Sequence, residues 1–125
     1  MGYIFLLCAA LSGFMAVGLG AFAAHGLKAR LAPELLAVFQ TGVQYQMYHA
    51  LALLGIAALL KMVGHNIWLQ TGGILFIIGT LLFSGSLYGL ALGGPRLLGP
   101  ITPLGGVCFL LGWLALLVAA IKLKA

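Results

Sequence analysis

The sequence predicts an all-α membrane protein with four transmembrane helices and a short interfacial helix between the first and the second. Of its 125 residues, 64% are apolar, only 6% are charged and 19 are glycines. A soluble domain carries about 25% charged residues, so this composition excludes an ordinary soluble domain, and it also excludes a disordered or collagen-like chain. A spanning helix needs about 20 apolar residues, so four helices leave about 45 residues for loops and ends, whereas five would leave only about 25.

The apolar runs predict a single transmembrane domain over residues 1–125. The first run, from Tyr3 to Ala24, could be mistaken for a signal peptide because it ends near an Ala-Phe-Ala tripeptide. It is longer than the roughly 7–15 residues of a signal core, and no Lys or Arg precedes it, so we interpret it as a retained helix. The predicted spans are approximately residues 3–24, 43–60, 71–92 and 104–121.

Between the first two spans, the pattern indicates a short helix lying at the membrane interface. Pro33 suits a first helical turn, where its missing N–H has no partner to lose, and Glu34 beside it favours the positive end of the helix dipole. The apolar residues of this segment fall on one side: Leu31, Leu35, Leu36 and Phe39. We expect the interfacial helix to end at a bend near Gly42, where the second span begins.

Helix breakers separate the third and fourth spans. Residues 93–106 contain five glycines and three prolines. This composition predicts a stiff surface loop or a shallow re-entrant turn over residues 93–106, without a regular helix.

The charged residues are few and scattered. The net charge is +5, but the cations form no patch and no basic-aromatic run, so we expect no nucleic-acid partner and regard membrane lipid as the partner of these cations. The loops on one side carry Lys28, Arg30 and Arg96; the other side carries Lys61, Lys122, Lys124 and the amino terminus. The small excess on the second side favours cytoplasmic termini.

Glu34 is the only acidic residue of the chain. It shares a predicted loop with Lys28 and Arg30, and it lies on the same membrane side as Arg96. We expect a structural ion pair with one of these cations, and a contact with a substrate or ion is the alternative.

Polar residues gather on one face of the second span. At 100° per residue, five of them fall within an arc of about 140°: Thr41, Gln44, Tyr45, Tyr48 and His49. Such side chains are costly against lipid and should point into the bundle. We favour a structural hydrogen-bond network with Thr80, Ser84 and Tyr88 of the third span, and the alternative is a polar cavity in which His49 accepts protons or contacts a ligand.

No constellation for catalysis, metal or cofactor binding is evident. His25, His49 and His65 lie in three different segments at no familiar ligand spacing, and the two cysteines are far apart. The chain has no Asp, so neither a carboxylate pair nor a Ser-His-Asp triad can form. We expect no cofactor and no metal.

Small residues form two rows that predict close helix packing. The first span carries Ser12, Ala16 and Gly20, and the third carries Gly85, Gly89 and Gly93. In lipid, helices associate mainly through such close backbone approach. Two such faces exceed the need of one four-helix bundle, which predicts a homo-oligomer.

Several segments resemble the YgdD/YwdK-like family of small bacterial membrane proteins. The resemblance rests on five segments: Gly20-Ala-Phe-Ala-Ala-His-Gly-Leu27, Phe39-Gln-Thr-Gly-Val-Gln-Tyr-Gln-Met-Tyr-His-Ala-Leu-Ala-Leu53, Leu82-Phe-Ser-Gly-Ser-Leu-Tyr88, Gly99-Pro-Ile-Thr-Pro-Leu-Gly-Gly106 and Gly112-Trp113. Position 23 is Ala where this family is expected to have Gly. The resemblance implies four membrane helices and a bacterial inner-membrane location, and it implies no established activity.

The sequence thus favours a non-enzymatic structural or accessory membrane protein that forms a homo-oligomer. The main alternative is a small transporter or channel with a path along the polar face of the second span, and a lipid- or quinone-binding enzyme ranks third. No small-molecule ligand can be named from the residues.

Overall fold

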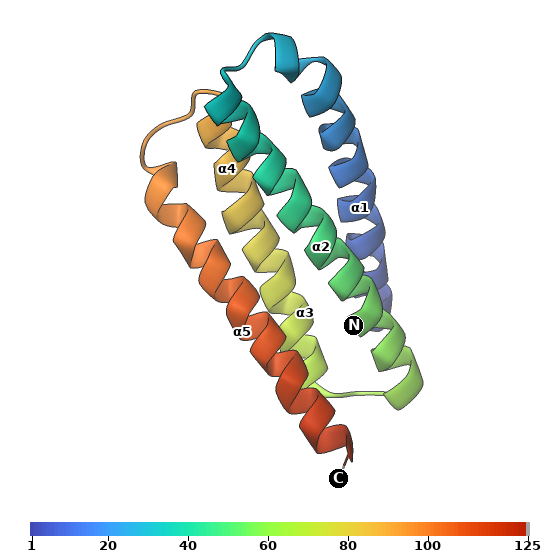
Figure 1. Cartoon of the computed structure of the whole chain (residues 1–125). Coiled ribbons are helices and arrows are strands. Elements are labelled where there is room, and N and C mark those ends of the chain that lie inside the picture. The colour runs from blue at the N-terminus through green and yellow to red at the C-terminus, as the bar shows by residue number, and fades with distance from the viewer. Residues whose placement is uncertain (125) are drawn as a thin grey trace.

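The computed structural model describes residues 1–124, and all regular structure within them is helical. The elements are α1 (Gly2–His25), η1 (Leu27–Ala29), α2 (Pro33–Val63), α3 (Ile67–Gly79), η2 (Thr80–Ser84), α4 (Gly85–Ala91) and α5 (Leu98–Lys124) (Figure 1). Because α3, η2 and α4 follow one another without a break, they form one span, and the described residues contain four helices that are long and apolar enough to cross a membrane. The predicted fold class is confirmed.

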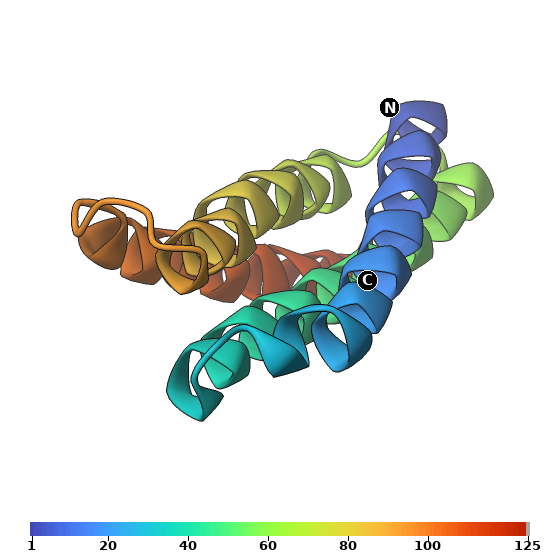
Figure 2. The ribbon, with the colours of Figure 1, turned by 90° about the horizontal axis from the view of Figure 1, so that it is seen from above.

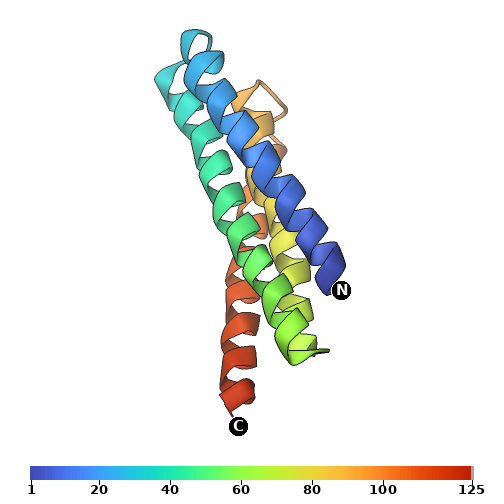
Figure 3. The ribbon, with the colours of Figure 1, turned by 90° about the vertical axis from the view of Figure 1, so that its right-hand side faces the viewer.

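The four spans are arranged as two pairs that meet at α2. Helix α1 packs along α2, and α5 packs along the α3–η2–α4 span, which in turn contacts α2. Seen from above, the two pairs diverge, so that α1 lies apart from most of α3 and α4 (Figure 2). The turns that follow α1 and α4 lie at one end of the molecule, and both termini lie toward the other end (Figures 1 and 3).

Aromatic rings seated on glycines bring α3 and α5 close together. A methyl group at Gly79 would lie 2.5 Å from the ring of Phe109, and one at Gly112 would lie 2.6 Å from the ring of Phe76. Lipid contacts an apolar helix as favourably as another helix does, so a close fit of this kind stabilises helix pairs in a membrane. Phe76 and Phe109 are buried in the larger of the two apolar clusters.

The separate interfacial helix is not confirmed, because α2 runs unbroken from Pro33 to Val63. Pro33 does begin the helix, as predicted. The bend expected at Gly42 is wrong: Gly42 is buried inside α2, where its missing side chain leaves room for the Tyr88 ring. At 1.5 Å per residue the 31 residues of α2 extend about 46 Å, which exceeds the roughly 30 Å hydrocarbon core.

The expectation that residues 93–106 form no regular helix is wrong for their second half, because α5 begins at Leu98. Pro100 lies in the first turn of α5, where backbone N–H groups have no helical partner in any case. Pro103 lies inside the helix and leaves the Gly99 carbonyl without its usual donor. The turn itself is confined to residues 92–97, where Gly93 has a φ of 90° that favours glycine.

The third span contains one π-helical segment, η2, which the sequence did not indicate. At its end, the N–H of Gly85 bonds to the carbonyl of Thr80, five residues earlier. Such wide turns insert an extra residue and shift the angular positions of all residues that follow. Here the shift affects Ser84 and Tyr88, both of which contact α2.

Candidate functional site

His49, near the middle of α2, is buried with 5% of its surface exposed, and both of its ring nitrogens have partners. Nδ1 lies 2.7 Å from the backbone oxygen of Tyr45. Nε2 lies 3.1 Å from Nε1 of Trp113 on α5. Since a carbonyl oxygen only accepts and an indole N–H only donates, His49 carries its proton on Nδ1 and accepts at Nε2. The imidazole is therefore neutral in this arrangement.

Aromatic rings of α3 and α5 enclose this imidazole. Phe109 stacks on it with centroids 3.6 Å apart and planes inclined by 6°, and Phe76 approaches its edge at a centroid distance of 5.2 Å. Trp113 packs on Phe76 at 5.0 Å. An imidazolium would point a second N–H at the indole N–H and would lose this hydrogen bond. The surroundings therefore favour a structural role for His49 over proton transfer.

Gln46, one turn before His49, connects α2 to two other helices. Its side-chain Nε2 donates to the backbone oxygen of Ser12 on α1 at 3.0 Å. Its Oε1 accepts from the hydroxyl of Tyr88 on α4 at 2.5 Å. Only 4% of the Gln46 surface is exposed. A neutral amide with a donor and an acceptor thus holds three helices together in the interior.

Ser84 makes a second link between α2 and the third span. Its hydroxyl donates to the backbone oxygen of Gly42 at 2.7 Å, and the side chain is completely buried. Tyr88 lies beside it, and a methyl group at Gly42 would come within 2.7 Å of Cε1 of that ring. The absence of a side chain at Gly42 therefore permits both contacts.

The link between α4 and α5 is made by two hydroxyls. Ser86 and Thr102 share a hydrogen bond of 2.5 Å, in which one hydroxyl donates its single proton to the other. The accepting hydroxyl keeps its own proton for a backbone carbonyl, that of Phe83 if it is Ser86 or that of Leu98 if it is Thr102. Within residues 1–124, every buried side-chain nitrogen and oxygen has a hydrogen-bond partner. Each of these interior polar atoms thus has at least one partner within the chain.

Comparison with known proteins places the chain in a family. Residues 19–106 match the family described as "Protein of unknown function (DUF423)". The chain is 46% identical over 119 residues to the UPF0382 membrane protein YwdK of Bacillus subtilis, covering 95% of this chain and 97% of that protein. The chain belongs to this family. It is also 47% identical over 119 residues to the UPF0382 inner membrane protein YgdD of Escherichia coli K12, covering 95% of this chain and 90% of that protein. No solved structure matches the chain.

The family membership confirms the resemblance found in the sequence. Together with the four spans, it identifies the chain as a multi-pass bacterial membrane protein, and the name of the Escherichia coli relative agrees with the predicted inner-membrane location. These names assign no activity to the relatives.

Three of the eight residues predicted for the polar network take part in links between spans: His49, Ser84 and Tyr88. Thr41 and Thr80 instead donate to carbonyls of Ala37 and Phe76 in their own helical segments. Gln44, Tyr45 and Tyr48 are exposed. The partner of His49 is on α5, not on the third span as expected.

Four residues of the network were missed by sequence reasoning: Gln46, Ser86, Thr102 and Trp113. Gln46 lies outside the arc drawn through the other polar residues of α2. Ser86, Thr102 and Trp113 are isolated polar groups in apolar or glycine-rich segments, where no periodic pattern marks them.

The two rows of small residues have different surroundings. In the first row, Ala16 is buried and a methyl group at Gly20 would lie 3.4 Å from Val43 of α2, while Ser12 accepts from Gln46. In the second row, a side chain at Gly85 would meet open space, Gly89 lies against Leu98, and Gly93 belongs to the turn after α4.

The residues of the predicted ion pair lie at one end of the molecule. Lys28 and Arg30 follow α1, Glu34 is exposed in the first turn of α2, and Arg96 lies in the turn before α5 (Figure 1). Their pairing stays a prediction. Over residues 1–124, no three His, Cys, Asp or Glu side chains gather where they could hold a metal ion.

Proposed function

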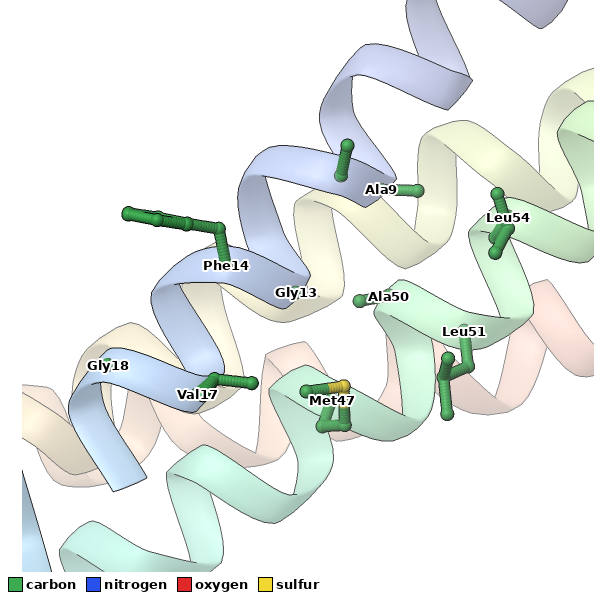
Figure 4. Close-up of a pocket in the computed structure, with 10 residues that line it drawn as sticks. Ala9, Gly13, Phe14, Val17, Gly18, Met47, Ala50, Leu51 and Leu54 are labelled. Atoms are coloured by element: carbon green, nitrogen blue, oxygen red, sulfur yellow. The ribbon is translucent and has the colours of Figure 1, made fainter. Parts of the chain in front are cut away.

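We propose that the protein is a non-enzymatic structural or accessory protein of the bacterial cell membrane and that it works as a homo-oligomer. The observation that supports assembly is a groove of about 610 Å³ on the outer side of α1 and α2. Figure 4 shows its lining, with Gly13 and Gly18 from α1 and Ala50 from α2. All groove residues are small or apolar, so a further helix could lie in it closely.

The glycines of this groove have no packing role within one chain. A methyl group at Gly13 or Gly18 would meet no atom within 4 Å. A glycine inside a helix makes the folded protein less stable than an alanine would, by about 0.5–1 kcal/mol. A glycine is therefore favoured at such a position only where something else needs the space. Ala9 and Gly13 form the small-xxx-small spacing that lets transmembrane helices approach closely. A helix from a second copy is the occupant that matches this surface.

The arrangement around His49 supports a role without catalysis. The imidazole is neutral, its two nitrogens are engaged, and Gln46 and Ser84 use their polar atoms to join helices. A general acid or base needs access to a substrate proton, and a metal site needs several ligands. The geometry instead favours side chains that fix the positions of the spans.

The assembly is tested by Gly13→Leu in lipid nanodiscs or mild detergent, with the oligomer mass measured by native mass spectrometry. We expect the wild type to be a dimer or larger and Gly13→Leu to shift it toward the monomer, while circular dichroism stays unchanged. Gly55→Leu is the matched control, because Gly55 is also on an outer face with open space around it but does not line the groove. A monomeric wild type, or a mutant of unchanged mass, would contradict the proposal.

Transport is the alternative function, and one observation favours it: His49 lines cavities on two sides of α2. Proton or cation flux across proteoliposomes, measured over roughly pH 5–8, separates the two functions. We expect no flux above empty liposomes in either the wild type or His49→Gln. A pH-dependent flux in the wild type that disappears in His49→Gln would overturn the structural proposal.

A further inference from the structure

A cavity of about 300 Å³ lies between α1 and the α3–η2–α4 span, with α2 as its floor. Its volume is at the lower end of the range of small-molecule sites, about 300–1,000 Å³. Its lining residues come from both helix pairs, which diverge in the view of Figure 2. It also adjoins the π-helical segment, through Thr80 and Leu81, and π-helical turns occur frequently at functional sites.

Apolar contacts flank the cavity toward both ends of α1. Toward the amino terminus of α1, the ring of Phe5 packs onto Gly73 of α3. Toward the other end of α1, Ala23 is buried in one cluster with Phe39 and Ala91. The side between α1 and the third span is where exposed residues line the cavity.

The mouth of the cavity faces the lipid. Leu11 and Met15 of α1 and Leu81 of η2 line the cavity and are 61%, 46% and 69% exposed. These side chains are apolar, and they belong to the middle portions of two membrane spans. A molecule dissolved in the bilayer can thus reach the cavity without crossing water.

The floor offers neutral hydrogen-bonding groups in otherwise apolar surroundings. Gln46 and Tyr88 line the cavity. The bonds of Gln46 to Ser12 and Tyr88 use one of its two amide protons and one of the two lone pairs on Oε1. One N–H donor therefore remains for a ligand oxygen. No lining residue is charged, and an ion would find no counter-charge there.

We propose that this cavity binds one neutral, mainly apolar molecule from the bilayer, whose hydroxyl or carbonyl oxygen accepts a hydrogen bond from the Gln46 amide. The apolar body of that molecule lies between α1 and the third span, against Phe76 and Leu53. This site is on the opposite side of α1 from the oligomerisation groove, apart from Ala50, which borders both. Binding and assembly can therefore fail independently.

The probe for this site is a diazirine-bearing dodecanol, photolysed with the full-length protein in nanodiscs and mapped by peptide mass spectrometry. We expect labels on the walls of the cavity, around Leu11 and Leu81. Excess dodecanol should suppress this labelling about fivefold better than excess dodecane, the size of effect that one net hydrogen bond gives. Labels spread evenly over the lipid-facing residues, or equal competition by the two compounds, would overturn the proposal.

Two variants test the cavity and its polar floor separately. Gly85→Leu places a side chain into the cavity at a position where a methyl group meets nothing within 4 Å, so it should fill the site without disturbing the fold. We expect it to reduce labelling severalfold, while the control Gly55→Leu leaves it unchanged. The double variant Gln46→Leu/Tyr88→Phe removes both polar groups together and should abolish the preference for dodecanol over dodecane. Unchanged labelling in Gly85→Leu, or an unchanged preference in the double variant, would refute the site.

Discussion

The hydrogen bond between His49 and Trp113 can be tested by a double-mutant cycle. Trp113→Phe keeps an aromatic ring against Phe76 and removes the indole N–H, and His49→Leu removes the acceptor. Each single variant leaves one polar group of the pair without its partner, beside the aromatic rings of Phe76 and Phe109. Replacing both residues together leaves neither group unpaired, so the double variant should lose less stability than the sum of the single ones.

The expected magnitudes follow from the geometry. His49 is 5% exposed and its Nε2 lies 3.1 Å from the indole nitrogen, so an unpaired nitrogen there should cost about 1–3 kcal/mol. The loss in His49→Leu should be the larger of the two, because the variant also gives up the stacking with Phe109 at 3.6 Å. Coupling energies of hydrogen bonds between membrane helices average about 0.6 kcal/mol and reach about 1.7 kcal/mol. We expect a value in the upper half of this range.

The assay is equilibrium unfolding in mixed micelles of a mild detergent and SDS, followed by far-UV circular dichroism, whose signal does not depend on the number of tryptophans. His49→Gln serves as the conservative variant, because its amide retains a donor and an acceptor, and we expect it to keep the fold and most of the stability. If the stability loss of the double variant equals the sum of the losses of the two single variants, no bond connects His49 and Trp113. A Trp113→Phe variant as stable as the wild type would equally contradict the assigned tautomer.

Two further predictions concern other links of the bundle. Gly42→Leu should lower the free energy of unfolding by about 1–3 kcal/mol or more, because its side chain would displace the Tyr88 ring. Ser84→Ala should lower it by only about 1 kcal/mol. Unfolding in mixed micelles measures both, and a smaller loss in Gly42→Leu than in Ser84→Ala would refute the packing argument. Glu34→Gln should leave the melting temperature in mild detergent nearly unchanged at low and high salt, because exposed ion pairs contribute little; a large decrease at low salt only would contradict this.

The number of spans could be predicted from composition and length, because the membrane imposes both. The orientation of α2 could not be predicted from its polar residues, because a polar side chain in a long helix can also face the membrane surface or bond to its own backbone. Gln44 and Tyr48 are exposed, and Thr41 bonds to Ala37.

A different pattern in α2 does mark its buried side. Residues separated alternately by three and four positions are all buried: Phe39, Gly42, Gln46, His49, Leu53, Ile56 and Leu60. This is the spacing of a helix seam, and it includes Gln46, which the polar arc left out. Apolar and polar members of one seam have to be counted together in a membrane helix, since hydrophobicity alone does not separate the interior from the lipid side.

The start of α5 was mispredicted for a different reason. Counting breakers over residues 93–106 treats every proline and glycine as equal, but their effect depends on position within the helix. Pro100 falls in the first turn, and the Thr102 side chain lies within hydrogen-bond distance of the Leu98 carbonyl. Gly105 is required by tertiary contact, because a methyl group there would overlap the backbone of Phe83. Close contact with the third span therefore accounts for a glycine that looks like a loop residue in the sequence.

The neutral hydrogen bonds are distributed over different helix contacts. Gln46 joins α2 to α1 and α4, Ser84 joins η2 to α2, and His49 joins α2 to α5. In a membrane interior, apolar contact alone specifies partners poorly, because lipid competes for it, whereas an unpaired polar group is costly in any wrong arrangement. All four of these bonds have one partner on α2, the side chain of Gln46 or His49 in three of them and the Gly42 carbonyl in the fourth, so α2 fixes the positions of the other spans. The same side chains, Gln46 and His49, also border the cavities, because α1 and the third span both pack on α2 but leave space between each other. A neutral ligand can occupy that space without disturbing the hydrogen bonds.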